Sequence, residues 1–252
     1  MPVIVKGHLL DRHRPTVCVP VTKNTEEEIL KEIRHLCRQD VEMIEWRADF
    51  YEDLLDEEKL KQILEKIGRI VEDHILLVTI RTKAQGGEIA LDETEYARLL
   101  LTIAITHKAD ILDVELLSLK DPARSIARLH EHGTVILASH HDFDKTPEKA
   151  VMLSVLEHMK EADADLVKLA VMPKSMEDVL LLLEATLQFH RQDPHVPLIT
   201  ISMGSLGLLS RLTGQIFGSC ITFASMGQAS APGQIDAKEL AEALDFIDKY
   251  YR

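Results

Sequence analysis

Short runs of apolar, mostly β-branched residues alternate along the chain with longer segments in which apolar residues recur at helical spacing. The apolar runs are 16–21, 41–46, 75–81, 109–117, 134–141, 164–171, 197–203 and 219–225. They begin 22 to 34 residues apart, which leaves room for two loops and one helix between successive runs. The pattern therefore predicts eight strands, each followed by a helix.

The segments between the runs carry the signals of helix starts. Thr25 and Glu28 have the spacing of a capping box, in which each residue bonds to the backbone of the other. Start signals of the same kind occur at Asp92, Asp121, Thr146, Ser175 and Asp236. These signals place one helix after most of the predicted strands.

A repeated strand–helix unit implies parallel strands with right-handed crossovers. Such a sheet can stay open, as in doubly wound folds, or close into a barrel. An open sheet of this kind typically has a Gly-rich nucleotide-binding loop after its first strand, and residues 21–24 (VTKN) do not form one. Because there are eight strands in 252 residues, we predict a (β/α)₈ TIM barrel, with residues 1–252 as a single catalytic domain.

Composition and charge narrow the possible partners and locations. The chain is 46% hydrophobic, and 29 basic against 42 acidic residues give a formal net charge of −13. This charge repels phosphate backbones and anionic membranes, so we expect neither nucleic acid nor a membrane as partner. The N-terminus lacks the apolar stretch of a signal peptide, and three cysteines without metal-ligand spacing fit a reduced, cytoplasmic protein.

Charged residues interrupt several of the apolar strands near their carboxyl ends, where barrels of this type carry their active sites. They are Glu45, Arg47, Arg81, Asp113, Glu115, His141 and Lys168. A purely structural explanation would need a separate buried ion pair for each, so we predict a site at this end of the barrel. We interpret Asp113 and Glu115 as structural counter-ions of the cationic interior.

Alternation along a strand assigns these residues to faces. Ser139 and His141 share one face of the fifth strand, whereas His140 lies on the opposite face with Ile136 and Ala138. We therefore predict that His141 points into the barrel and that His140 points outward. Adjacent strand residues cannot turn toward one ion, so we assign no metal site to them.

Lys168 is the most informative of the charged residues, because the strand around it is otherwise apolar. Burial, together with Arg47 and Arg81 nearby, should lower the pKa of its amine. A neutral amine attacks a carbonyl to give a Schiff base, and His141 could move protons beside it. This arrangement leaves both an aldolase and a dehydratase open.

Several sequence motifs resemble those of type I 3-dehydroquinate dehydratases. They are EWRAD at 45–49, SHHDF at 139–143 followed by TP at 146–147, VKLAVMP at 167–173, SRL at 210–212 and ASAPGQ at 229–234. The resemblance covers essentially the whole chain. It implies a cofactor-free and metal-free barrel enzyme of the shikimate pathway, usually homodimeric, that converts 3-dehydroquinate to 3-dehydroshikimate. The same reaction serves aromatic amino-acid biosynthesis and quinate breakdown, and the sequence does not distinguish the two.

The resemblance also implies roles for individual residues. Lys168 would be the Schiff-base lysine and His141 the general acid–base. Arg211 would bind the substrate carboxylate. The further substrate-binding residues would be Glu45, Arg47 and Arg81 at the ring hydroxyls, Met203 and Phe223 as apolar walls, and Ser230 and Gln234 from a loop that closes over the substrate.

The chain departs from the family pattern at Gln85, where many members carry glutamate, and a change of pH optimum would follow if that residue tunes the histidine. Two other functions are weighed against the dehydratase. A class I aldolase on the same barrel would usually need a phosphate site, and the glycine-rich segment 204–218 does not form a convincing one. A barrel that only binds a carboxylated ring would not need the reactive pair of Lys168 and His141.

Overall fold

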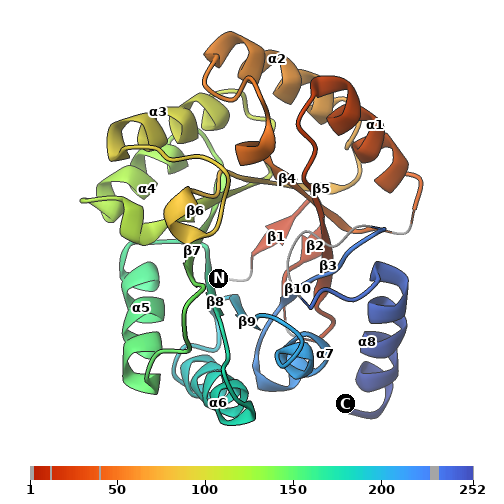
Figure 1. Ribbon diagram of the computed structural model, residues 1–252, viewed down its shortest axis with the longest axis vertical. Coiled ribbons are helices and arrows are strands. Elements are labelled where there is room, and N and C mark those ends of the chain that lie inside the picture. The colour runs from red at the N-terminus through yellow and green to blue at the C-terminus, as the bar shows by residue number, and fades with distance from the viewer. Residues whose placement is uncertain (1–2, 12, 40, 228–232, 252) are drawn as a thin grey trace.

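The computed structural model describes residues 3–11, 13–39, 41–227 and 233–251. Eight parallel strands form one sheet that is rolled into a nearly closed barrel, and helices surround it (Figure 1). The prediction of a TIM barrel is therefore confirmed.

Every predicted apolar run overlaps a barrel strand, although two strands extend one residue beyond their runs and several are shorter than theirs. The strands are β3 (Thr16–Val21), β4 (Met43–Arg47), β5 (Ile75–Thr79), β6 (Ile111–Glu115), β7 (Val135–Asp142), β8 (Leu166–Val171), β9 (Leu198–Ser202) and β10 (Ile221–Phe223). The helices are α1 (Glu26–Leu36), α2 (Glu57–Gly68), α3 (Glu93–Ala104), α4 (Pro122–His130), α5 (Lys149–Glu161), α6 (Met176–Gln192), α7 (Leu208–Phe217) and α8 (Ala237–Tyr251). Three short 3₁₀ helices, η1 (Ala48–Phe50), η2 (Lys83–Gln85) and η3 (Leu116–Ser118), follow β4, β5 and β6.

Sequence order is also spatial order around the sheet, from β3 to β9, and β10 pairs with β3. In the described part of the chain, β9 and β10 meet at one bridge between Leu198 and Ser219, where the Cys220 amide donates to the Leu198 carbonyl at 2.8 Å. This contact closes the barrel at its amino-terminal end.

Alternation along the strands separates two apolar layers. Cys18, Leu77 and Leu137 belong to a cluster inside the barrel. Their neighbours Val19 and Val78 belong to the larger cluster between the strands and the helices. Because all barrel strands run in parallel, the interior-facing residues at their carboxyl ends meet at one rim.

The helix-start signals are mostly accurate. Thr25 and Glu28 form the predicted capping box of α1, and Asp92 forms another at α3. Helix α5 starts only at Lys149, because the Thr146 hydroxyl donates to the Met172 carbonyl at 3.2 Å instead of capping a helix.

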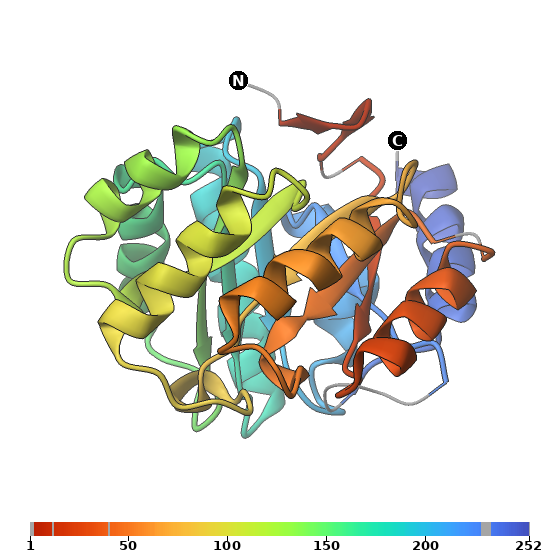
Figure 2. The ribbon, with the colours of Figure 1, turned by 90° about the horizontal axis from the view of Figure 1, so that it is seen from above.

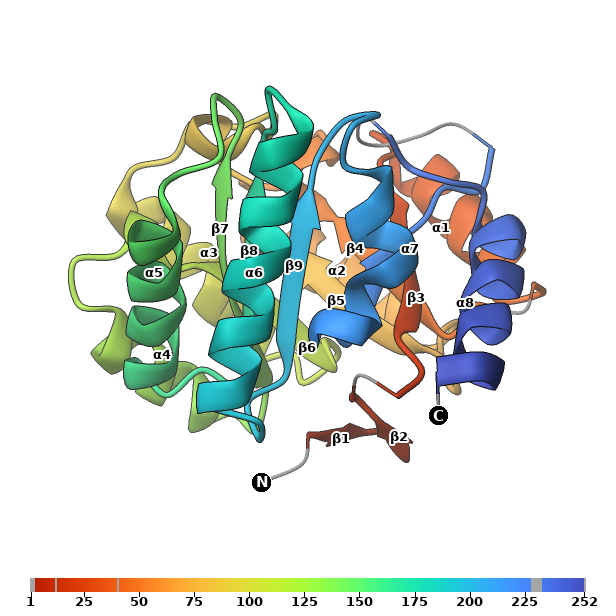
Figure 3. The same ribbon diagram turned by 90° about the horizontal axis from the view of Figure 1, so that it is seen from below.

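A hairpin that the apolar pattern does not predict lies across the amino-terminal end of the barrel. Its strands, β1 (Ile4–Val5) and β2 (His8–Leu9), are antiparallel and appear below the barrel in Figure 3 and above it in Figure 2. Leu10, which follows the hairpin, packs in the interior cluster. The Lys6 ammonium lies 2.9 Å from the Asp110 carboxylate. The hairpin therefore covers the end of the barrel that lies opposite the charged rim.

We predict that this hairpin contributes measurably to stability. Leu10 is 2% exposed, so Leu10→Ala should lower the free energy of unfolding by about 2 to 4 kcal/mol through lost burial and a cavity. The neighbouring Leu9 is 47% exposed, and Leu9→Ala should change it by less than about 0.5 kcal/mol. Urea unfolding followed by circular dichroism measures both values, and equal effects would contradict this packing.

Candidate active site

A cavity opens at the carboxyl-terminal rim of the barrel. It is lined by Glu45, Arg47, Arg81, Gln85, Gly86, His141, Phe143, Lys168, Ala170, Ile201, Met203, Arg211, Phe223 and Gln234. The structure thus gathers nine of the ten residues that the sequence nominates for the site. The tenth, Ser230, lies outside the described residues.

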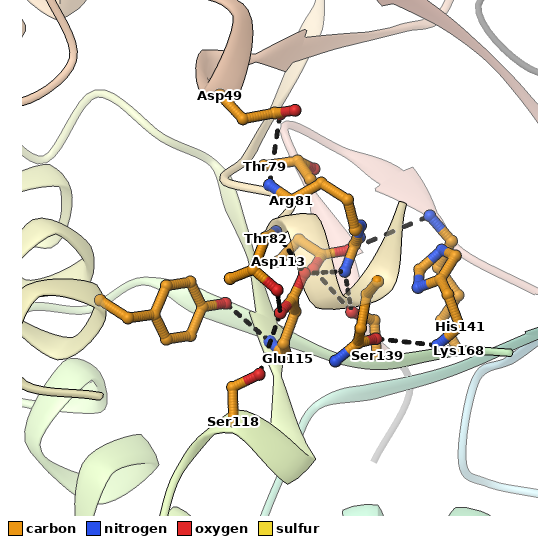
Figure 4. A network of polar contacts seen from close by, with 12 residues as sticks. Asp49, Thr79, Arg81, Thr82, Asp113, Glu115, Ser118, Ser139, His141 and Lys168 are labelled. Atoms are coloured by element: carbon orange, nitrogen blue, oxygen red, sulfur yellow. Dashed lines mark hydrogen bonds and ion pairs between the residues drawn. The ribbon is translucent and has the colours of Figure 1, made fainter. Parts of the chain in front are cut away.

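Arg81 lies at the centre of a buried polar network below this cavity (Figure 4). One guanidinium nitrogen, Nη1, donates to Glu115 Oε1 and to Ser139 Oγ, both at 3.0 Å, and Nη2 donates to Asp113 Oδ2 at 2.8 Å. Burial by itself would lower the pKa of Arg81, but Asp113 and Glu115 raise it above its ordinary value. The two carboxylates therefore hold the arginine charged inside the barrel.

Lys168 reaches the floor of the cavity from β8. Its side chain is almost fully buried, with Nζ 3.9 Å from Asp113 Oδ2 and 4.0 Å from the centroid of the Phe223 ring. Burial lowers the pKa of the amine, Arg81 lowers it further, and Glu45 and Asp113 oppose that change. The neutral, nucleophilic form of Lys168 is therefore more accessible than that of a solvated lysine.

Arg47 is held by Asp49, to which the pattern of charges in the sequence assigns no role. Both oxygens of Asp49 accept from Arg47, each at 2.7 Å, so the pair is bidentate. Asp49 Oδ1 also accepts from the Arg81 amide at 3.2 Å, and Asp49 Oδ2 accepts from the Glu88 amide at 3.3 Å. Asp49 therefore joins the end of β4 to the loop after β5.

Glu45 is buried at the same rim and accepts from Thr79 Oγ1 at 2.8 Å. Thr79 is the inward-facing residue of the adjacent strand, one position beyond Val78 of the outer layer. This hydrogen bond fixes the direction of one carboxylate in the cavity.

His141 stands at the cavity wall on β7, and His140 is not among the lining residues. The His141 ring stacks on Phe143 at 6.4 Å between centroids and 18° between planes. Its backbone amide donates to Gln85 Oε1 at 2.8 Å. Burial lowers the pKa of His141 well below its ordinary value, and Arg81, Lys168 and Arg47 add to this, so the imidazole is neutral near pH 7 and can accept a proton.

The loop that carries Gln85 has a shape that suits this contact. Gly86 follows η2 with a φ of +82°, and a Cβ there would lie 2.3 Å from the Phe143 ring. Glycine at this position therefore allows the loop to turn while Phe143 stays against His141. Alternation predicts that His141 faces inward, but no pattern in the sequence predicts its contacts with Gln85 and Phe143.

Arg211 enters the cavity from α7 rather than from a strand. It is 3% exposed, and Nη1 donates to the Phe223 carbonyl at 3.2 Å. Burial lowers the pKa of Arg211 to about 10, so the guanidinium still carries its charge at neutral pH. A buried cation in an open cavity is suited to a carboxylate ligand, because the planar fork can bind both oxygens.

The described residues show neither a metal site nor a membrane-spanning helix. His130 pairs with Asp165 at 2.9 Å. The described residues contain no group of three or more His, Cys, Asp or Glu side chains placed to hold a metal ion. Across the same residues, no helix has the length and apolar character needed to cross a bilayer.

Comparison with known proteins gives a consistent result. The sequence profile of type I 3-dehydroquinase matches residues 17–251. The 3-dehydroquinate dehydratase of Listeria welshimeri is 41% identical over 250 residues, which are 99% of each chain. The enzyme of that name from Lactiplantibacillus plantarum is 44% identical over 233 residues, 92% of each chain.

Solved structures agree with these relatives. The 3-dehydroquinate dehydratase of Geobacillus kaustophilus superposes with a TM-score of 0.95 at 36% identity, covering 100% of this chain and 98% of that one. The type I enzyme of Clostridium difficile, solved with covalently modified comenic acid, also gives 0.95 at 38% identity, covering 99% and 98%. A 3-hexulose-6-phosphate synthase, at 17% identity and a TM-score of 0.58, shares the fold alone.

The environment of His141 leads to a prediction about its titration. In the wild type, its imidazole should protonate only well below the ordinary pKa of about 6.5, because burial and three cations disfavour the charged form. Gln85→Glu places a carboxylate beside this histidine and should raise its pKa. An NMR titration of the His141 ring protons measures both values, and an unchanged pKa in the variant would refute this account of the electrostatics.

Proposed function

The chain belongs to the type I 3-dehydroquinase family, and on that premise we propose that it is a hydro-lyase that removes water from 3-dehydroquinate to give 3-dehydroshikimate, with Lys168 as the Schiff-base residue. The main support for this proposal is that a buried Lys168 and His141 line the same cavity at the carboxyl-terminal rim of the barrel. The two side chains face inward from adjacent strands, where Ser139 pairs with Lys168 and His141 pairs with Ala170. A nucleophile and a base thus face one cavity.

The first step is the condensation of Lys168 with the C3 ketone. Neutral Nζ attacks the carbonyl carbon, the C–O bond breaks with loss of water, and the product is an iminium cation. The overall step balances: the protonated Lys168 amine and the ketone together give the iminium cation and one molecule of water. The iminium withdraws electrons from the neighbouring carbon and makes its hydrogen acidic.

The second step is the elimination. His141, neutral because its pKa is lowered, removes a proton from C2 and the electron pair forms an enamine. The enamine expels the C1 hydroxyl, which takes the proton from His141 and leaves as water. Hydrolysis of the remaining iminium releases 3-dehydroshikimate and restores Lys168.

The other residues of the cavity bind and orient the substrate in this proposal. Arg211 binds the carboxylate, which places C2 beside the imidazole. The ring hydroxyls are bound by Glu45, Arg47 and Arg81, the apolar walls are Met203 and Phe223, and Gln234 lines the cavity on the side of the segment after β10. The family resemblance assigns a substrate contact to Ser230 as well, which lies outside the described residues. The fixed directions of Glu45, Arg47 and Arg81 support this assignment, since preorganised donors and acceptors do not have to reorient during the reaction.

The alternatives are less well supported. A class I aldolase would use the same lysine chemistry, but the family match and the buried Arg211 favour a carboxylated substrate. A barrel that only binds its ligand would not need an amine and an imidazole whose pKa values are both lowered.

From the family resemblance we also propose a homodimer in the cytoplasm, acting in the shikimate pathway, in which residues 1–252 form one catalytic domain. The net charge of −13 supports the expectation that neither nucleic acid nor a membrane is its partner.

Removing the nucleophile should abolish turnover. Lys168→Ala should lower kcat by about 10⁴-fold or more, because no other route to the iminium exists in this mechanism. Lys174→Ala serves as a control, since Lys174 is an exposed lysine close along the chain. Formation of the conjugated product is followed by ultraviolet absorbance, and substantial turnover by Lys168→Ala would rule out the mechanism.

Removing the base should separate the two steps. His141→Ala should still form the iminium, so borohydride should trap a substrate adduct, while kcat falls by about 10² to 10⁴-fold. His140→Ala is the matched control, because this neighbour does not line the cavity. If the two histidine variants lost the same activity, the assignment of His141 would be wrong.

A further inference from the structure

Asp113 lies between the structural network and the reactive lysine. It is 0% exposed on β6, and its Oδ2 accepts from Arg81 Nη2 at 2.8 Å while lying 3.9 Å from Lys168 Nζ. Its other oxygen, Oδ1, accepts from Ser139 Oγ at 2.7 Å (Figure 4). Both oxygens are therefore held, and the carboxylate cannot turn freely toward the lysine.

This placement affects the lysine chemistry directly. A carboxylate in direct contact with Lys168 would stabilise the ammonium form, which cannot attack a ketone. A buried iminium without a nearby anion would be costly, because an uncompensated charge in the barrel interior loses its hydration. Asp113 Oδ2 lies 3.9 Å from Lys168 Nζ, and Arg81 and Ser139 hold the two carboxylate oxygens in place. The carboxylate is therefore near enough to stabilise a cation at Nζ without binding the ammonium directly.

Resting on the proposed function, we infer that Asp113 is a positioning residue that acts through Lys168: its restrained carboxylate is the counter-ion of the iminium formed there. The condensation converts the Lys168 ammonium and the ketone into an iminium and water, so Nζ is cationic before and after the step. The Phe223 ring, 4.0 Å from Nζ, supplies a second stabilising contact for that cation.

Glu115 provides a matched comparison within the same network. It also pairs with Arg81, at 3.0 Å, and it is equally buried. The other hydrogen bonds of its carboxylate come from Thr82 and Ser118, and among the described residues no ion pair links it to Lys168. If both carboxylates only stabilise the structure, neutralising either one should affect the chemistry of Lys168 to a similar extent. If Asp113 is the counter-ion of the iminium, neutralising Asp113 should have the larger effect.

The test compares Asp113→Asn with Glu115→Gln. For each purified variant, the rate of borohydride trapping with 3-dehydroquinate and the value of kcat are measured across a range of pH. The charged or titratable groups around Lys168 are Glu45, Arg81, Asp113, Cys18 and His141, and each variant changes one charge in the Arg81 network.

For Asp113→Asn, we expect the trapped fraction and kcat to fall by about tenfold or more, because the iminium loses its counter-ion. The pH at which trapping is half-maximal should also move to lower values, since the ammonium form loses the same counter-ion. Glu115→Gln should leave this midpoint at its wild-type position, whatever it does to stability. Equal midpoints in the wild type and both variants, with native circular dichroism, would overturn the inference.

A second variant keeps the test decisive if Asp113→Asn does not fold. Ser139→Ala removes the hydroxyl that holds Asp113 Oδ1, so the carboxylate can turn toward Lys168. The trapping midpoint should then move to higher pH, opposite to the first shift, and an unmoved midpoint would contradict the inference. Failure of the wild type to give any adduct at Lys168 would instead refute the proposed function, so the two failures are distinguishable.

Discussion

The buried ion pairs of Arg81 with Asp113 and Glu115 are the interaction on which the active-site rim depends. The interior of a barrel is normally filled by apolar side chains, and a lone cation there would be strongly disfavoured. Here each carboxylate accepts from a different guanidinium nitrogen, and Ser139 and Thr82 satisfy further oxygens. With its charge balanced in this way, Arg81 can lie next to Lys168 and lower the pKa of the amine. The ion-pair network of Arg81 and the reactive amine of Lys168 are thus neighbours in the barrel interior.

Parallel strands then determine which residues face that space. Each strand alternates between the interior and the helices, so that polar side chains two residues apart, such as Ser139 and His141, both face the barrel interior. Ser139 joins the buried Arg81 network and His141 lines the cavity above it. The amino-terminal end is closed by the hairpin and by the interior cluster that includes Leu10. The barrel is therefore apolar at one end and charged at the other, and burial of the charged end lowers the pKa values of both Lys168 and His141.

Much of this arrangement could be predicted from the sequence, because strand periodicity and the position of charges within apolar runs are local signals. They identify the eight strands, the inward direction of His141 and the counter-ion role of Asp113 and Glu115. Contacts that depend on loop conformation could not be predicted in this way. The bond from His141 to Gln85 and the cover provided by two-residue strands β1 and β2 are examples. The bidentate bond from Arg47 to Asp49, which lies in the 3₁₀ helix η1 directly after β4, is a further contact that strand periodicity does not predict.

Whether Lys168 is the residue that forms the covalent intermediate is tested by locating that intermediate in the wild-type enzyme. Intact-mass spectrometry after mixing the protein with 3-dehydroquinate and borohydride, followed by peptide mapping, identifies any reduced adduct and the residue that carries it. We expect a single adduct on the peptide that contains Lys168. An adduct on another lysine, or turnover without any adduct, would show that Lys168 is not the Schiff-base residue.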